Sequence, residues 1–189
     1  ALPGFSISLA GTNAVAGDEL RLLAAGTQLA SVLLTADMVT AGSVNLSPAQ
    51  ALPAGSTTLT AQLLDVAGNT SATGSSLSLT VDNSAPYAPR ISSFSPDTGD
   101  SNSDNLTSSS QPTFTGTAEA GATVNLRSGT TVLGTAVANS AGEWTLTLGA
   151  ALSDGTHSLS AVATEVAGNV SPVSPTLSLE IDTQGPSIG

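Results

Sequence analysis

The chain has 189 residues, of which 40% are hydrophobic but only 3% aromatic, so a core must be built mainly from Leu, Val, Ile and Ala. Fourteen acidic residues against three arginines give a net charge of −11, which repels phosphate backbones and excludes nucleic-acid binding. The absence of cysteine removes disulfides, thiolate metal sites and cysteine nucleophiles. No apolar run approaches the roughly 18–20 residues that span a bilayer, so direct membrane insertion is not expected.

The second half of the chain repeats the first at a displacement of 100 positions. Residues 64–69 (LDVAGN) recur as 164–169 (TEVAGN), and 77–82 (LSLTVD) recur as 177–182 (LSLEID). The segment 83–89 carries two prolines, which favour an extended connector, and the same connector begins again after residue 182. We therefore expect two domains, 1–82 and 83–189, within a longer array. Because neither end resembles a signal peptide, residue 1 is expected to begin a fragment whose first strand is truncated.

Apolar and polar residues alternate along both repeats, as in half-buried β-strands. Residues 17–34 are rich in Leu and Ala, but their match to strands of the second repeat favours sheet, and no helix is expected. Leu77, Leu79 and Val81 alternate with polar residues, as do Trp144, Leu146 and Leu148, and Trp144 is expected in the core. In the second repeat we expect strands near 88–94, 112–118, 122–128, 131–137, 142–149, 156–165 and 174–182. Seven short strands in about 100 residues predict an all-β fold of two tandem immunoglobulin-like β-sandwiches in an elongated arrangement.

Several motifs, most of them in the second repeat, occur together in a known family. They are Pro112–Val124 (PTFTGTAEAGATV), Gly142-Glu143-Trp144, residues 154–157 (DGTH), the Ala-Gly-Asn turn and the strand-ending Asp82 followed by Pro86. In these motifs the chain resembles the bacterial immunoglobulin-like repeats of giant surface adhesins. The resemblance implies a non-catalytic stalk on the surface of Gram-negative bacteria, of the RTX and biofilm-associated kind, exported by a type I secretion system. It also implies Ca²⁺ at the junctions between repeats.

The predicted topology gives a separate argument for junction Ca²⁺. Successive strands of a sandwich run in opposite directions, so the second–third and sixth–seventh loops share one end with the incoming connector. Glu119, Glu165 and Asp82 would therefore converge, and such like charges repel unless a cation joins them. Hard oxygen ligands suit Ca²⁺. Asp65 and Asn13 would form an equivalent upstream half-site, and Asp182 would supply the first ligand of the next junction. The alternative is that these acids are ordinary solvated loop residues.

A second acidic cluster lies in the long loop after the first strand of the second repeat. Its oxygen-bearing residues, Asp97, Asp100, Asp104 and Asn105, resemble a calcium loop, although the EF-hand pattern is absent. A structureless connection of roughly 17 residues is long, which suggests that something organises it. The alternative is a flexible polar loop that needs no ion.

Catalytic motifs are scarce, because His157 is the only histidine and no nucleophile elbow or phosphate loop is present. We therefore expect no enzyme, and a monomer whose partners are neighbouring repeats of the same chain. Two functions remain open. The repeats are either Ca²⁺-stiffened spacers that project an adhesive tip for biofilm or host attachment, or a module that itself binds a carbohydrate or host protein. The scarcity of aromatic residues disfavours the second.

Overall fold

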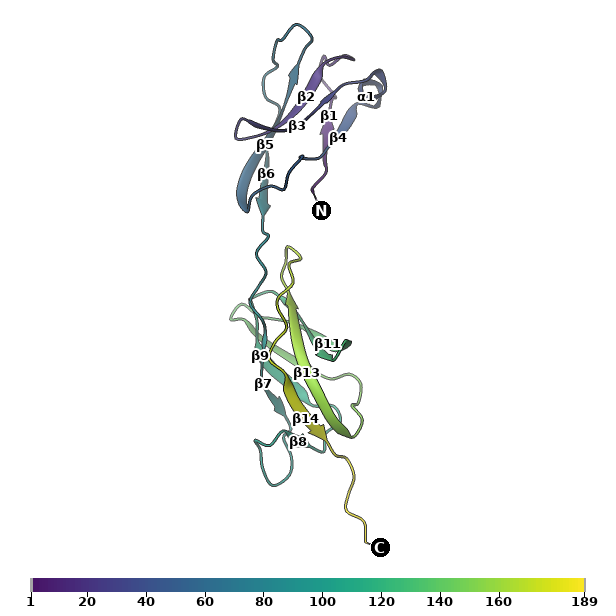
Figure 1. The fold of residues 1–189 in the computed structure, drawn as a ribbon, viewed down its shortest axis with the longest axis vertical. Coiled ribbons are helices and arrows are strands. Elements are labelled where there is room, and N and C mark those ends of the chain that lie inside the picture. The colour runs from purple at the N-terminus through teal and green to yellow at the C-terminus, as the bar shows by residue number, and fades with distance from the viewer. Residues whose placement is uncertain (1, 189) are drawn as a thin grey trace. The chain divides into compact units, whose positions relative to one another are not determined.

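A computed structural model describes residues 2–188 of the chain. The chain divides into two compact units, Ala1–Asp82 (unit 1) and Asn83–Gly189 (unit 2). In the described residues each unit consists of strands in two sheets, and unit 1 adds one short helix (Figure 1). The all-β class expected from the sequence is confirmed.

The strands of unit 2 form one three-stranded and one five-stranded sheet. The smaller sheet has the order β12 (Glu143–Thr147), β9 (Thr113–Thr117), β7 (Arg90–Ser95). The larger has the order β11 (Thr131–Val137), β10 (Thr123–Ser128), β13 (Gly155–Thr164), β14 (Leu177–Ile181), β8 (Leu106–Thr107). All neighbouring strands are antiparallel except β14 and β8, which are parallel.

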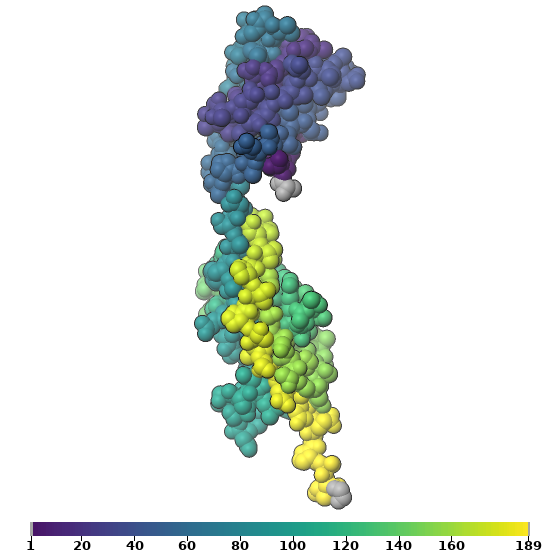
Figure 2. All heavy atoms as spheres, in the orientation of Figure 1, coloured from purple at the N-terminus to yellow at the C-terminus, as the bar shows by residue number. Residues whose placement is uncertain are grey.

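The core of unit 2 lies between its sheets because alternate side chains of each strand point to the same face. In β14, Leu179 and Ile181 are buried whereas Glu180 is exposed. The facing sheet contributes Phe114 and Trp144, which confirms the core position expected for the tryptophan. The chain after β14 leaves the body of the unit as an extended segment (Figure 2).

Unit 1 repeats this plan with fewer strands. One sheet pairs β1 (Phe5–Ser8) with β4 (Ser43–Leu46), and the other has the order β3 (Thr27–Leu33), β2 (Glu19–Ala24), β5 (Gly55–Leu64), β6 (Leu77–Val81). Its core consists of smaller aliphatic side chains, namely Leu9, Leu20, Leu22, Leu34, Val44, Leu46 and Leu59.

The two units correspond residue by residue through their strand pairing. Val44 pairs with Ile7 in β4 and β1 as Trp144 pairs with Gly116 in β12 and β9. Phe5 then corresponds to Phe114, since these residues pair with Leu46 and Leu146. The tryptophan needs a glycine opposite, because a Cβ atom at Gly116 would run into the Trp144 ring. The smaller Val44 leaves room for Ile7.

The structure corrects the expected number of strands. All seven strands expected in the second repeat have counterparts in unit 2, but β8 is an eighth strand, and unit 1 shows six among the described residues. A two-residue strand such as β8 is too short to show an alternating pattern. It forms because Glu180 and Asp182 donate their backbone N–H groups to the carbonyl oxygens of Asn105 and Thr107, at 2.9 and 3.0 Å.

The expectation of no helix is also wrong, because α1 (Ala36–Ala41) joins β3 to β4 in unit 1. Local capping explains it. The Thr35 hydroxyl accepts a hydrogen bond from the N–H of Met38, and Gly42 ends the helix with a left-handed φ of 70°. The Gly42 N–H donates to the carbonyl oxygens of Met38 and Val39.

Candidate calcium-binding loops

The structure places Glu119 and Glu165 at the same end of unit 2. The loops 118–122 and 138–142 are joined there, since the Gly121 N–H donates to the carbonyl oxygen of Ala138 at 3.0 Å. Thr123, the first residue of β10, pairs with Thr164, the last residue of β13. Glu165 therefore follows β13 at the point where the loop 118–122 joins β10. Arg90 pairs with Thr117, which brings the end of the connector to the same place.

The carboxylate of Glu119 makes no hydrogen bond to another residue in the described part of the chain. Its side chain is half-buried, and its backbone carbonyl oxygen closes the loop by accepting from the N–H of Ala122 at 3.0 Å. Both carboxylate oxygens can therefore bind a cation without loss of an existing contact.

The Glu165 carboxylate, in contrast, shapes its own turn. It accepts hydrogen bonds from the N–H groups of Ala167 and Asn169, at 2.6 and 2.9 Å, and from the Asn169 side chain at 2.6 Å. The N–H groups of Ala167 and Asn169 hold the pKa of Glu165 below its usual 4.5. This structural role accounts for the acidic residue of the repeated turn without an ion.

Asp65 makes the matching turn in unit 1. Its carboxylate accepts from the Asn69 N–H at 2.8 Å and from the Asn69 side chain at 2.9 Å, and the side-chain bond is the main reason why its pKa is lowered. Asn13, the other residue of the predicted half-site, is exposed in the loop between β1 and β2. It lines a cavity of about 270 Å³ to which Asp65 does not belong.

The remaining predicted junction residues each lie just after the last strand of their unit. Asp82 is the last residue of unit 1, so the predicted set of Asp82, Glu119 and Glu165 combines residues of both units. Asp182 follows β14 and accepts a hydrogen bond from the Gln184 N–H at 2.9 Å.

Asp154, which begins the DGTH motif of residues 154–157, holds the chain that follows β14. Its carboxylate accepts from the N–H and hydroxyl of Thr183, at 3.0 and 2.8 Å, and from the Gln184 side chain at 3.0 Å. Gln184, followed by Thr183, lowers the pKa of Asp154. These hydrogen bonds from Thr183 and Gln184 to Asp154, called the Asp154 clasp, fix the start of the segment that follows β14. Unit 1 has Ala54 at the position of Asp154.

Hydroxyl groups and strand pairing organise the long loop after β7. The Thr107 hydroxyl is fully buried and donates to the carbonyl oxygen of Pro96 at 2.7 Å, and the Thr98 hydroxyl accepts from the Ser108 N–H at 2.7 Å. The loop thus has an ordered path without an ion.

The acidic residues of this loop differ in their surroundings. Asp104 accepts from the Leu106 N–H at 3.1 Å, and Asp100 is exposed. Asp97 has one buried carboxylate oxygen, Oδ1, with no hydrogen-bond partner, and it lines a cavity of about 260 Å³ together with Asn102 and Asn105. A buried unpaired carboxylate oxygen is costly, so this atom suits a cation or water.

Within either unit, over residues 2–188, no group of three or more Asp, Glu or His side chains is arranged to hold a metal ion. Glu119 and Asp97 are therefore single carboxylates and not members of such a group. A complete shell of six to eight oxygens would need carbonyl groups and water as well.

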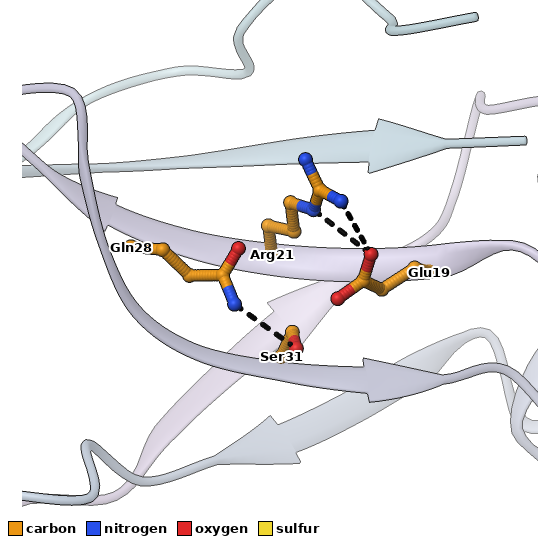
Figure 3. Close-up of polar contacts among 4 residues, drawn as sticks. All are labelled: Glu19, Arg21, Gln28 and Ser31. Atoms are coloured by element: carbon orange, nitrogen blue, oxygen red, sulfur yellow. Dashed lines mark hydrogen bonds and ion pairs between the residues drawn. The ribbon is translucent and has the colours of Figure 1, made fainter. Parts of the chain in front are cut away.

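Unit 1 has further polar contacts that the sequence did not indicate. Asp18 is buried and accepts from the Val15 N–H at 2.9 Å, which closes the loop before β2. On the outer face of β2, Arg21 donates to Glu19 at 2.6 and 2.9 Å, as Figure 3 shows. The hydrogen bond from Arg21 is the main reason why the pKa of Glu19 is lowered. This ion pair is a surface contact and not part of a binding site.

No helix in the described part of the chain is long and apolar enough to cross a membrane.

The sheets, the buried aromatic pair and the paired end loops define an immunoglobulin-like sandwich. The bacterial Ig-like domain family matches residues 87–183, about half of the chain, and the chain belongs to this family. No curated protein matched the chain.

Solved structures with similar folds share little sequence identity with the chain. The fibronectin(III)-like modules of Clostridium thermocellum CbhA match with a TM-score of 0.50 at 13% identity, over 96% of this chain and 86% of that one. The BSP domain of a biofilm associated protein matches at 20% identity and a TM-score of 0.38, over 96% of this chain and 28% of that one. A tetra-tandem repeat in the extending region of a large adhesion protein matches at 21% identity and a TM-score of 0.40, over 96% of this chain and 46% of that one. The chain thus spans less than half of the two adhesion-related chains, and at such identities the likeness concerns the fold alone.

Proposed function

We propose that the two units are non-catalytic spacer repeats of a large bacterial cell-surface adhesin. They would carry an adhesive tip away from the cell for biofilm or host attachment, with neighbouring repeats of the same chain as their partners. Membership of the bacterial Ig-like domain family and the displaced sequence repeat support this role. An extracellular position and export by a type I system belong to the same proposal.

The aromatic residues favour a spacer over a ligand-binding module. Of the five in the chain, Phe94, Phe114 and Trp144 are buried and Phe5 is half-buried. Tyr87, 58% exposed, is the one that is open to solvent in the described residues. Carbohydrate sites and protein hot spots use exposed aromatic side chains, and a single tyrosine provides little of such a surface.

Ca²⁺ at the junction between the units would stiffen the stalk. The observation that carries this proposal is the Glu119 carboxylate, which lies at the connector end of unit 2 and makes no hydrogen bond to any of residues 2–188. With Glu165 in the neighbouring turn and Asp82 before the connector, an ion would offset the repulsion among three carboxylates. Fixing the connector in this way would remove conformational freedom that prolines alone leave. Asp65 with Asn13, and Asp182, would belong to the junctions on either side.

The loop after β7 would hold a second, weaker Ca²⁺. The unpaired Oδ1 of Asp97 supports this proposal, with Asn105 beside it in the cavity. Asp100 and Asp104 would contribute from the same loop, directly or through water.

Calorimetry of the whole chain, with millimolar Ca²⁺ and with EGTA, tests the junction site. We expect Ca²⁺ to raise the melting temperature and to lengthen the particle in small-angle X-ray scattering. Glu119→Gln is the sharpest variant, because it removes a charge without breaking a hydrogen bond, and it should abolish most of the Ca²⁺-dependent shift. Asp82→Asn should act in the same direction.

Glu180→Gln is the matched control, since Glu180 is an exposed strand residue outside every predicted site. It should leave the Ca²⁺ response unchanged. Isothermal titration of the same variants counts the ions, and Asp97→Asn should remove one of them. Equal melting temperatures with Ca²⁺ and EGTA would contradict the junction site.

A further inference from the structure

The large sheet of unit 2 has an outer face, directed away from the core, that carries apolar side chains. In β10, Val124 and Leu126 belong to the core, so Arg127 points to the outer face. Val132 of β11 pairs with Arg127 and lies on the same face, where it is 49% exposed.

Three more valines belong to this face. Val162 of β13 stands between the core residues Ala161 and Ala163, so it points outward, and it is 4% exposed beneath its neighbours. Val170 forms a bridge with the last residue of β13, which points to the same side as Val162, and it is 56% exposed. Val137 ends β11 and is 66% exposed. These four valines and Arg127 are called the valine face, and an exposed apolar patch is typical of an interaction surface.

The matching face of unit 1 is polar. Strand pairing gives the counterparts of three of the valines, namely Gln28 for Val132, Gln62 for Val162 and Thr70 for Val170. The polar groups bind one another: Arg21 donates to Glu19, and Gln28 donates to Ser31 at 3.2 Å (Figure 3). The two units therefore share the sheet but not the chemistry of its outer face.

The strands of the valine face contain no acidic residue. Residues 120–142 and 155–164, which include β10, β11 and β13, have no Asp or Glu, although the chain has fourteen. Glu180 of β14 pairs with Thr156, toward the other end of β13 from Val162. The Nε atom of Arg127 is buried and has no hydrogen-bond partner in residues 2–188. A buried N–H group without an acceptor is costly, which favours a partner that brings one.

We propose that the valine face binds a second copy of the chain, through the same face of that copy, in a symmetric dimer. Two chains of net charge −11 repel each other wherever their carboxylates meet, and the valine faces can approach without such a meeting. The face also offers acceptors for the Arg127 Nε of the other copy. Ser160 pairs with Arg127, and Asn125 and Thr135 pair with each other beside it.

The size of the valine face predicts a weak contact. With ten residues in β13 and four neighbouring chain segments, the face measures roughly 30 Å by 15 Å. Two such faces bury roughly 900 Å² together, less than the roughly 1,200–2,000 Å² of stable interfaces. The dilute chain is then a monomer, and dimers form with a dissociation constant of roughly 0.1–1 mM. Among many stalks on one cell several such contacts would act together, and this consequence alone rests on the proposed spacer function.

Sedimentation of the whole chain from about 10 µM to about 1 mM tests the proposal, with EGTA present so that Ca²⁺ plays no part. We expect the mean mass to rise from that of the monomer toward that of the dimer. Raising NaCl from about 20 to about 500 mM should strengthen the dimer, because salt screens the repulsion between the two acidic chains. A constant monomer mass would overturn the proposal. So would a dimer that salt weakens, because Arg127 would then bind a carboxylate.

Three variants locate the contact. V132Q/V170T introduces the residues of unit 1 at two exposed positions, and it should weaken the dimer about tenfold without changing the melting temperature. V170T alone should weaken it about threefold. Val170 is separated from β11 by β10 and β13, so a V170T dimer of full strength would mean pairing along the edge of β11 and would overturn the proposal.

V166T is the matched control. Val166 is 91% exposed, but it lies in the turn after β13 and outside the valine face. The same exchange of an exposed valine should therefore leave the dimer unchanged, and a weakened V166T dimer would contradict the assigned surface.

Discussion

Units 1 and 2 share a strand plan but differ in how their sheets are covered. Leu59 and Leu159, on the matching central strands β5 and β13, are 2% and 0% exposed. Leu79 and Leu179, on the neighbouring strands β6 and β14, differ: the first is half-buried and the second fully buried. The difference begins where unit 2 has β7 and β8 and unit 1 shows no counterpart in the described residues. Sequence repetition therefore conserves the centre of the sandwich, whereas the edge strands decide how much of its apolar surface is buried.

The units also differ in the segment before the last strand. Ser171 and Ser174 of unit 2 are buried, and their hydroxyls accept from the N–H groups of Ala163 and Ala161, each at 2.9 Å. In unit 1, Ser71 makes the first of these contacts, with the Leu63 N–H, but Gly74 stands where Ser174 would make the second. In this segment the two units therefore differ by one buried hydroxyl group.

The largest expected difference concerns the matching phenylalanines. Phe114→Ala should destabilise unit 2 by about 3–5 kcal/mol, because it empties a fully enclosed site. Phe5→Ala should destabilise unit 1 by roughly 1–2 kcal/mol, since less apolar area is lost. Amide exchange of the strands of each unit measures both. Equal losses of stability for the two variants would show that Phe5 is packed as completely as Phe114.

An intermediate effect is expected at Ser174. Ser174→Ala should cost unit 2 about 1–3 kcal/mol, since it leaves the buried Ala161 N–H without that hydroxyl. Gly74→Ser should stabilise unit 1 by roughly 0.5–1.5 kcal/mol, because it adds the hydroxyl and reduces the freedom of the unfolded chain. A Cβ atom at Gly74 has space, with its nearest contact at 3.6 Å. Thermal unfolding of both variants checks the prediction, and a destabilised Gly74→Ser would contradict it.

The smallest expected effect is a pH dependence of the contacts that Asp154 makes in unit 2. The hydrogen bonds from Gln184 and Thr183 lower the pKa of Asp154 in the folded state from its usual 3.8. The clasp therefore contributes its full stabilisation at neutral pH, begins to lose it as the pH falls toward 3.8, and has lost it below the folded pKa. Amide exchange at Thr183, corrected for its intrinsic pH dependence, should accelerate over this range.

Asp154→Asn should remove most of this pH dependence, because the side chain no longer titrates. Asn83 is the counterpart of Thr183, and Ala54 stands where Asp154 would accept its hydrogen bond, so amide exchange at Asn83 should show no such change. A pH response at Thr183 that survives Asp154→Asn would assign the effect to another group.

Much of the fold and part of the candidate site could be read from the residues alone. The alternation of Leu77, Leu79 and Val81 with polar residues is a local property of a half-buried strand, so it can be recognised without knowing the partner strands. Because successive strands run in opposite directions, the sequence also predicted Glu119 and Glu165 at one end of unit 2, and both lie there in the structure. The hydrogen bonds of these carboxylates could not be predicted, because side-chain direction and loop path depend on the folded turn.

The sequence by itself determined the β-pattern, the repeat and the connector, because each depends on the order of neighbouring residues. Only the tertiary structure decided the rest. The Asp154 clasp joins residues 29 positions apart, and β8 exists because β14 lies beside it. Phe114 is buried beside β7, which pairs with β9, whereas β1 of unit 1, which carries Phe5, has no such neighbour in the described residues. Such contacts arise only when distant segments pack together, and no local pattern encodes them.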